Sequence, residues 1–266
     1  MPRAPKIKTP GLQVVEYENY HRYKIDGDWV VGVTTALNGI PKNLTRWAAR
    51  EVADYAIRNL RTVSQVSESA GYGPAMDMLT AIPNQRRDDA AIRGTDVHVL
   101  AERYIQGEEI DVPDHLFPYV QGYAEYITDY NPESVFDELV VGHREHGFAG
   151  RLDSVQRSKL YGTALIDYKT GNRIYGNHAL QCVAYCNPDI ALVDGETIPF
   201  ERIDTAFILH IQPGTYDLIP VEVNEWAFES FLVCLDHYKR NVQSDGRKLK
   251  ALLGEPLPRP TQEAVA

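Results

Sequence analysis

Residues 150–185 of the chain read GRLDSVQRSKLYGTALIDYKTGNRIYGNHALQCVAY, and this stretch predicts the centre of the fold. The run 147–156 alternates apolar and polar residues as a half-buried strand does, and 163–170 is a second, largely apolar run. Residues 158–162 between them are typical of a turn. The stretch therefore predicts a β-hairpin, followed by a helix over 176–186.

Asp167 and Lys169 are two positions apart on the second expected strand. Because side chains alternate faces along a strand, both project to one side, whereas Tyr168 points away and leaves its backbone carbonyl near the same edge. If the hairpin register places Asp153 opposite, two carboxylates converge with this carbonyl. Such an all-oxygen set suits Mg²⁺ or Mn²⁺ better than zinc, so we expect one of these ions as cofactor, with Asp153, Asp167 and the Tyr168 carbonyl as ligands.

This set of residues suits phosphodiester hydrolysis. The reaction needs a Lewis acid on the phosphoryl oxygen, a water deprotonated near neutral pH, and stabilisation of charge on the leaving oxygen. A bound ion would provide the first two, and Lys169 would orient the water or neutralise the developing charge. The alternative is a surface ion pair between Asp167 and Lys169, which is common and contributes little. The Asp-x-Lys triplet alone leaves both readings open.

A longer pattern is more specific. Gly150 and Asp153 are followed, after thirteen residues, by residues 167–169, and then by Gln181 and Tyr185. This order resembles the RecB-type branch of the PD-(D/E)xK nucleases. The resemblance implies an α/β fold with a mixed central β-sheet flanked by helices, that is, a restriction-endonuclease-like core, with a helical insertion. It also implies that Asp153, Asp167 and Lys169 are catalytic and that Gln181 and Tyr185 position the substrate.

An upstream histidine extends the resemblance. Gly94 lies four residues before His98 on a helix expected over 84–105. In the RecB-type branch a helix with a Gly-x-x-x-His signature sends the histidine to the metal, which implies His98 as a further ligand. The alternative is a structural histidine in the core. The wider layout, over roughly residues 30–240, is similar to phage exonucleases and mitochondrial genome-maintenance exonucleases of this branch.

Some members of that branch hold an iron-sulfur cluster on four cysteines, but this chain has three cysteines, Cys182, Cys186 and Cys234, so no cluster is expected. Small buried apolar positions suit them better. An odd, sparse set forms no disulfide framework, which fits a reducing compartment. Since no apolar run could span a bilayer and the amino terminus lacks the apolar stretch of a secretory signal, we expect a cytoplasmic location and no membrane partner.

The formal net charge of -10 is unfavourable for a protein that binds a polyanion, because nonspecific affinity comes mostly from neutralised phosphates. The charge is unevenly distributed, however. Residues 1–50 hold eight Lys/Arg and four Asp/Glu, whereas residues 101–140 hold one Arg and ten Asp/Glu. We expect the acidic block to face solvent away from the substrate, and a bound ion adds positive charge to a cleft. DNA, single-stranded or with free ends, is therefore the expected partner.

Four regions are expected along the chain: a small β region over 1–42, a helical wall or arch over 43–130, the nuclease core over 131–242, and a disordered tail over 243–266. The first contains strands over 12–18, 20–26 and 28–33. The second contains helices over 43–60 and 84–105, separated by a broken connection over 62–83 that could move as a lid. The third contains strands over 134–143, 203–211 and 215–223 and an amphipathic helix over 225–242.

Two further groups of residues could be functional, but a non-functional explanation is favoured for each. The aromatic residues of 117–130 could stack on bases, but at helical spacing packing is favoured. His143 and His146 resemble a metal pair but fall in an expected exposed turn, so they are discounted as ligands.

We expect a Mg²⁺- or Mn²⁺-dependent deoxyribonuclease, namely an exonuclease that prefers single-stranded ends and acts in DNA recombination, repair or replication. The exonuclease mode depends on the helical region roofing the active site, as it does in the exonucleases that the chain resembles. An endonuclease of the same fold and a non-catalytic nucleic-acid-binding subunit are the alternatives.

Overall fold

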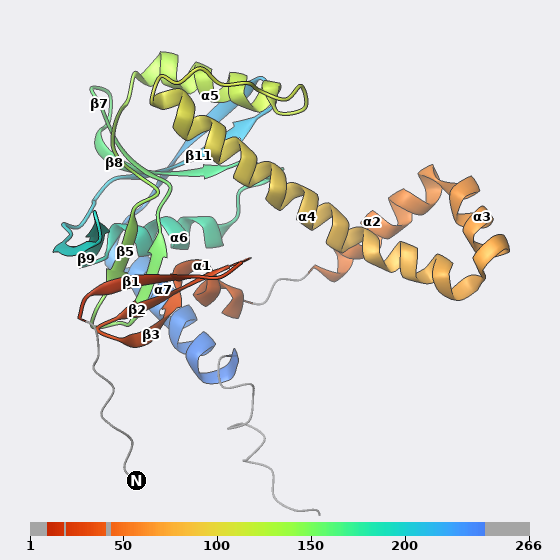
Figure 1. Cartoon of the computed structure of the whole chain (residues 1–266), viewed down its shortest axis with the longest axis horizontal. Coiled ribbons are helices and arrows are strands. Elements are labelled where there is room, and N and C mark those ends of the chain that lie inside the picture. Colours follow the sequence, from red (N-terminus) through yellow and green to blue (C-terminus); the bar gives the residue numbers. More distant parts are fainter. Residues whose placement is uncertain (1–9, 19, 41–43, 243–266) are drawn as a thin grey trace, which may run out of the picture.

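The computed structural model describes residues 10–18, 20–40 and 44–242. The chain forms two mixed β-sheets flanked by helices, with a helical insertion between the first three strands and the rest (Figure 1). The predicted α/β class and mixed sheet are confirmed, although the strands divide between two sheets. The tail 243–266 lies outside the described residues. None of the helices in the described part of the chain is long and apolar enough to cross a membrane.

A five-stranded sheet carries the predicted hairpin. Ser154 pairs with Ile166 in an antiparallel register, so Asp153, one residue earlier, lies beside Asp167, one residue later. The neighbouring strand on the other side runs parallel, which makes this sheet mixed. Its strands, in spatial order, are β12 (Thr215–Val221), β11 (Ala206–Gln212), β8 (Gly162–Lys169), β7 (Ser154–Ser158) and β4 (Glu133–Asp137).

A seven-stranded sheet contains the three amino-terminal strands at the predicted positions. They continue into strands of the core, so the segment 1–42 shares a sheet with the segment 131–242. The strands, in spatial order, are β1 (Leu12–Glu16), β2 (His21–Ile25), β3 (Asp28–Gly32), β6 (Phe148–Arg151), β5 (Val140–His143), β9 (Ile190–Val193) and β10 (Glu196–Pro199).

The prediction of one continuous strand over 134–143, and of another over 147–156, was wrong. Each run passes from one sheet to the other: the first becomes β4 and β5, the second β6 and β7. The break in the first run is at Glu138, whose φ of 50° lies in the left-handed region. The amide of Glu138 donates to the carbonyl of Asp153 at 2.9 Å, so the two runs cross between the sheets side by side.

The helices are α1 (Val33–Ala36) with a 3-10 turn (Leu37–Gly39), α2 (Thr45–Arg58), α3 (Leu60–Ala70), α4 (Tyr72–Ile105), α5 (Phe117–Tyr130), α6 (Gly176–Cys186) and α7 (Glu225–His237) with a π-helical turn (Tyr238–Val242). The bounds of α6 are those that the sequence predicts.

The expected broken connection over 62–83 is also corrected, because α3 and the first part of α4 fill it. Gly71 separates these helices with a φ of 100°, and Pro74 lies in the first turn of α4, where its missing N–H costs nothing. At 34 residues, α4 is roughly 50 Å long. Its first half projects from the sheets together with α2 and α3 as a helical arm (Figure 1).

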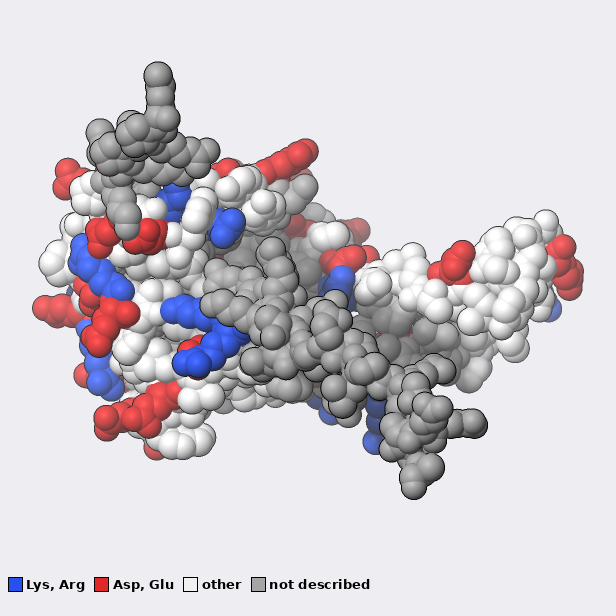
Figure 2. All heavy atoms as spheres, turned by 90° about the horizontal axis from the view of Figure 1, so that it is seen from below, with Lys and Arg blue, Asp and Glu red and all other residues white. Residues whose placement is uncertain are grey.

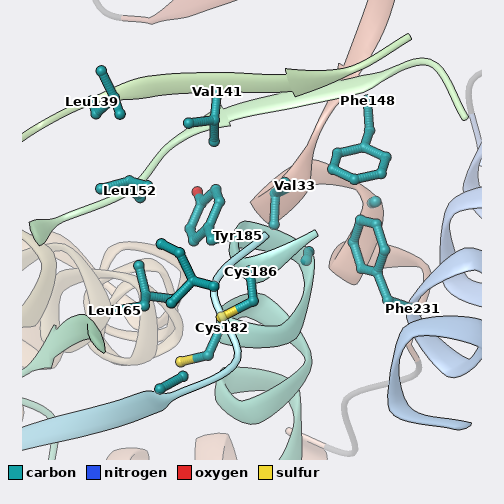
Figure 3. Packing of buried hydrophobic residues seen from close by; sticks show 14 of the residues in the cluster. Val33, Leu139, Val141, Phe148, Leu152, Leu165, Cys182, Tyr185, Cys186 and Phe231 are labelled. Carbon is teal, nitrogen blue, oxygen red and sulfur yellow. The ribbon is translucent and has the colours of Figure 1, made fainter. Parts of the chain in front are cut away.

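Two apolar clusters lie on opposite faces of the five-stranded sheet. Side chains alternate along β8, so that Leu165 faces one cluster and Ile166 the other. The first cluster fills the space between both sheets, α6 and α7 (Figure 3). The second lies under α5 and the end of α4, where Tyr123 and Tyr126 are fully buried, so the packing reading is confirmed for these two rings.

A close approach of α6 to β6 explains why position 150 is a glycine. A Cβ atom there would lie 2.6 Å from Cε1 and 2.9 Å from the hydroxyl of Tyr185. Because Tyr185 is only 3% exposed and packs among Leu152, Val141 and Leu165 (Figure 3), its ring has little room to move.

Gly150→Ala should therefore lower the free energy of unfolding by about 1–3 kcal/mol, the usual effect of overpacking a tight core. Gly73→Ala is the matched control, because no atom lies within 4 Å of its added Cβ and alanine favours a helix. Urea unfolding followed by circular dichroism measures both variants. Equal midpoints for the wild type and Gly150→Ala would contradict the packing described here.

Candidate metal and catalytic site

The carboxyl-terminal end of strand β8 brings Asp167 and Lys169 to one face of the five-stranded sheet, as the alternation along the strand predicts. Nζ of Lys169 lies 2.5 Å from Oδ2 of Asp167, whose side chain is 1% exposed. Oδ1 of Asp167 is also buried and accepts no hydrogen bond from the described residues. The pair is therefore not a surface ion pair, and one carboxylate oxygen still lacks a partner.

Both members of this pair have displaced pKa values. Burial raises the pKa of Asp167 to about 6, although the Lys169 ammonium works in the opposite direction. Burial alone would lower the pKa of Lys169, but the carboxylates of Asp167 and Asp153 outweigh it and raise that pKa above its ordinary value. At neutral pH the lysine is therefore an ammonium held against a carboxylate.

Asp153 immediately precedes β7, and its side chain contacts the end of β8. Its Oδ2 accepts a hydrogen bond of 2.7 Å from the backbone amide of Tyr168. Its Oδ1 lies 3.8 Å from Nδ1 of His98. The hairpin register thus places this carboxylate where the sequence predicts it, beside Asp167.

His98 reaches the same place from α4. Its Nε2 lies 3.0 Å from the carbonyl oxygen of Tyr168, and because a carbonyl only accepts, this nitrogen carries the proton. In the neutral ring, Nδ1 then keeps a free lone pair on the side of Asp153. Gly94, one turn earlier, faces Thr170, and a Cβ added there would make only an ordinary contact of 3.4 Å with Oγ1 of that residue.

Tyr168 connects the two faces of the sheet. Its carbonyl oxygen, a predicted metal ligand, lies within this group of residues and also accepts a hydrogen bond of 3.1 Å from Nζ of Lys169. Its side chain points to the other face, where the hydroxyl accepts a hydrogen bond of 2.7 Å from Gln156 and the ring packs on Tyr123.

Glu138 joins this group, and the sequence analysis missed it. His98, Glu138 and Asp153 each offer a ligand atom, and these atoms lie within 4.8 Å of one another. Burial raises the pKa of Glu138 to about 7 and the Asp153 carboxylate adds to the rise, while His98 and Arg151 oppose it. The one signal in the sequence is the pair of acids at 137–138, which interrupts the alternation of the expected strand.

Helix α6 lies behind the site. Gln181 is half-buried, whereas Tyr185 is 3% exposed and belongs to the core between the sheets (Figure 3). Burial raises the pKa of Tyr185 well above its ordinary value, and a hydrogen bond with Gln181 opposes the rise. Substrate positioning by these two residues stays a prediction. From where it lies, Tyr185 would act through Gln181 or Gly150 and not by direct contact.

The three cysteines and the two histidines that the sequence analysis discounted as ligands have packing positions. Cys182 and Cys186 are fully buried on α6, and Cys234 is partly buried on α7. The rings of His143 and His146 lie 4.4 Å apart, next to Phe228.

Comparisons with known proteins give weak matches. No family model and no curated protein matches the chain. An alkaline exonuclease (LHK-Exo) from Laribacter hongkongensis overlaps with a TM-score of 0.35 and 12% identity, over 59% of this chain and 83% of that one. Its complex with dAMP gives 0.35 and 11%, over 60% and 86%. SSO0001 gives 0.33 and 15%, over 91% and 80%. Such values establish no family, so the function has to be inferred from the site itself.

The raised pKa of Glu138 predicts how the stability of the metal-free protein depends on pH. A carboxyl with a folded-state pKa of about 7 binds more protons in the folded than in the unfolded chain above its ordinary pKa of 4.5, so stability falls as the pH rises through this window. Glu138→Gln should therefore stabilise the metal-free protein by about 1–2 kcal/mol near pH 8 and change little near pH 5, a value reduced for the solvent that reaches this residue, which is exposed although its carboxyl group is partly desolvated.

Urea unfolding in EDTA at both pH values measures this effect. Glu133→Gln, which changes an exposed carboxylate on β4, is the matched control. If Glu138→Gln and the wild type have the same pH dependence, Glu138 does not titrate as described.

Proposed function

We propose that this protein is a divalent-metal-dependent nuclease that hydrolyses phosphodiester bonds in DNA. One observation carries the proposal: His98, Glu138 and Asp153 converge beside the buried pair of Asp167 and Lys169. Three carboxylates, an imidazole and an ammonium in one place are a costly arrangement for a purely structural role, because the carboxylates repel one another and Asp167, which is 1% exposed, loses its hydration.

The residues present fit a hard divalent cation. Oδ1 of Asp167 is buried without a hydrogen-bond partner among the described residues. Burial raises the pKa of both Glu138 and Asp167, and the Asp153 carboxylate adds to each rise, so a bound cation would relieve the repulsion among these groups. Carboxylate oxygens with one imidazole suit Mn²⁺ or Mg²⁺. His98, Glu138, Asp153 and Asp167 would hold the ion, with the Tyr168 carbonyl as a further ligand. When bound, the ion would polarise the phosphate and lower the pKa of a water molecule.

The remaining groups would act on the reacting phosphate. Asp167 and the Tyr168 carbonyl hold Nζ of Lys169, so its positive charge is fixed before the substrate arrives. A preorganised ammonium can orient the attacking water or stabilise charge on the phosphoryl oxygens without reorganising during the reaction. Gln181 would hydrogen-bond a backbone or phosphate oxygen of the strand, which positions the strand without reading its sequence.

The finer proposal is an exonuclease that prefers single-stranded ends, acting in recombination, repair or replication. The resemblance noted in the sequence supports it. The roof expected from residues 43–130 is not what the structure shows: the end of α4 borders the site through His98, but the arm of α2, α3 and the first half of α4 projects away from the sheets (Figure 1). The expected roof therefore gives no support to the exonuclease mode, and digestion of circular DNA distinguishes an exonuclease from an endonuclease.

Lys169→Ala and Asp167→Asn should each lower DNA cleavage by about 100-fold or more and leave DNA affinity within about threefold, because they act on the reacting phosphate and not on bulk electrostatics. Cleavage of end-labelled DNA with Mg²⁺ or Mn²⁺ measures the rate, EDTA should abolish it, and fluorescence anisotropy measures binding. Lys159→Ala, at an exposed lysine in the β7–β8 turn, is the control. Folded Lys169→Ala protein that cleaves at nearly the wild-type rate would rule out this site.

The exonuclease mode predicts that a free end is required. Linear and covalently closed circular single strands of one sequence, both checked for nicks, should be digested under the same Mg²⁺ and salt conditions. We expect the linear strand to be degraded and the circle to survive, because the strand enters the site from its end. Degradation of the circle at the rate of the linear strand would identify an endonuclease instead.

A further inference from the structure

Two exposed tyrosines stack on each other at the turn between β1 and β2. The ring centroids of Tyr17 and Tyr20 lie 4.5 Å apart, and their planes are only 11° from parallel. The backbone amide of Tyr17 donates to the carbonyl of Tyr20 at 2.8 Å, which holds the two residues opposite each other. The residues are 42% and 59% exposed, so the pair presents aromatic surface to solvent.

This hairpin tip lies close to the candidate site. Glu16, the last residue of β1, accepts a hydrogen bond of 3.2 Å from Arg151, the last residue of β6, two residues before Asp153. Burial raises the pKa of Tyr23, the next tyrosine along β2, to about 12; Arg151 opposes the rise, and Glu16 and Glu138 add to it. The tip also points toward the side of the molecule from which α4 extends (Figure 1).

Two cationic side chains of β2 lie over an exposed aromatic ring of β3. Arg22 and Lys24 lie over the ring of Trp29, at 4.2 and 4.5 Å from its centroid, and Trp29 is itself 42% exposed. Seen from below, the side on which β1–β3 lie in Figure 1, the surface displays Lys and Arg side chains interspersed with Asp and Glu side chains (Figure 2). Cations beside exposed aromatic rings are the combination that binds single-stranded nucleic acid, since the cations meet phosphates and the rings meet bases.

We propose that Tyr17 and Tyr20 form a stacking platform for an unpaired base of the DNA strand whose phosphate lies in the metal site. This inference rests on the proposed nuclease function and adds how the strand is held beside the site. It also assigns base stacking to this hairpin instead of the α5 aromatics, of which Tyr123 and Tyr126 have no exposed surface. Stacking on a ring tolerates any base, so the platform would hold the strand without reading its sequence.

A cross-strand aromatic pair can also serve the hairpin alone, by stabilising its two strands. The two roles differ in what they predict. A purely structural pair affects unfolding and leaves DNA binding unchanged. A stacking platform binds DNA with bases more tightly than DNA without them. A change in protein stability alone would weaken the binding of both DNAs equally.

The test compares binding of a fluorescent oligothymidylate with binding of the same backbone carrying abasic sites, by anisotropy in EDTA so that nothing is cleaved. The wild type should prefer the thymidylate by about tenfold, and Tyr17→Leu/Tyr20→Leu should lose most of this preference. With Mg²⁺, the double variant should raise KM and leave kcat within about twofold. Tyr17→Phe/Tyr20→Phe keeps both rings and should retain the preference. Tyr72→Leu, at a tyrosine 75% exposed at the start of α4, is the control.

The outcomes separate this inference from the proposed function. If the wild type cleaves DNA and the double leucine variant, shown to be folded by its urea midpoint, keeps the thymidylate preference, the platform is wrong and the nuclease remains. If that variant unfolds, the single variant Tyr20→Leu gives the same comparison at the more exposed ring. A wild type that neither binds nor cleaves DNA overturns both.

Discussion

The buried carboxylate of Asp167 is the constraint on which the rest of the structure depends. A carboxylate with 1% exposure is stable only beside a compensating charge, and Lys169 provides it at 2.5 Å. The lysine in turn depends on the end of β8, where the Tyr168 carbonyl accepts a hydrogen bond from a second N–H of the ammonium group. The residues that would act on a phosphate are therefore the same ones whose buried charges cost free energy, and the rest of the fold has to compensate for that cost.

The passage of two chain segments from one sheet to the other determines what surrounds that pair. At this crossing the alternation of a strand is interrupted, and a side chain can point along the boundary between the sheets. Glu138 does so with a left-handed φ, and Asp153 does so opposite it, joined to it through the backbone. Two carboxylates thereby meet at the boundary, where His98 arrives from a helix that belongs to neither sheet.

Features with a local cause could be predicted from the sequence. The β7–β8 hairpin, its register and the bounds of α6 follow from alternation, turn residues and helical spacing, and they bring Asp153, Asp167 and Lys169 together. The crossing at Glu138 depends on contacts between distant segments, so the sequence indicated a continuous strand and Glu138 was missed. The arm was missed because glycine and proline at 71–74 suit a helix start as well as a break. Neither the burial of Tyr185 nor the exposed pair at the β1–β2 turn has a periodic signal.

The position of Tyr168 has a consequence for how the site moves. Its amide binds Asp153, its carbonyl binds Lys169 and lies against His98, and its side chain is anchored in the cluster on the opposite face of the sheet. The common residue of these groups pairs with Leu209 of β11 on one side of β8, and on the other side, beyond the last β7 pair, it holds the Asp153 carboxylate. The geometry of the site should thus persist for as long as the end of β8 stays paired with β11.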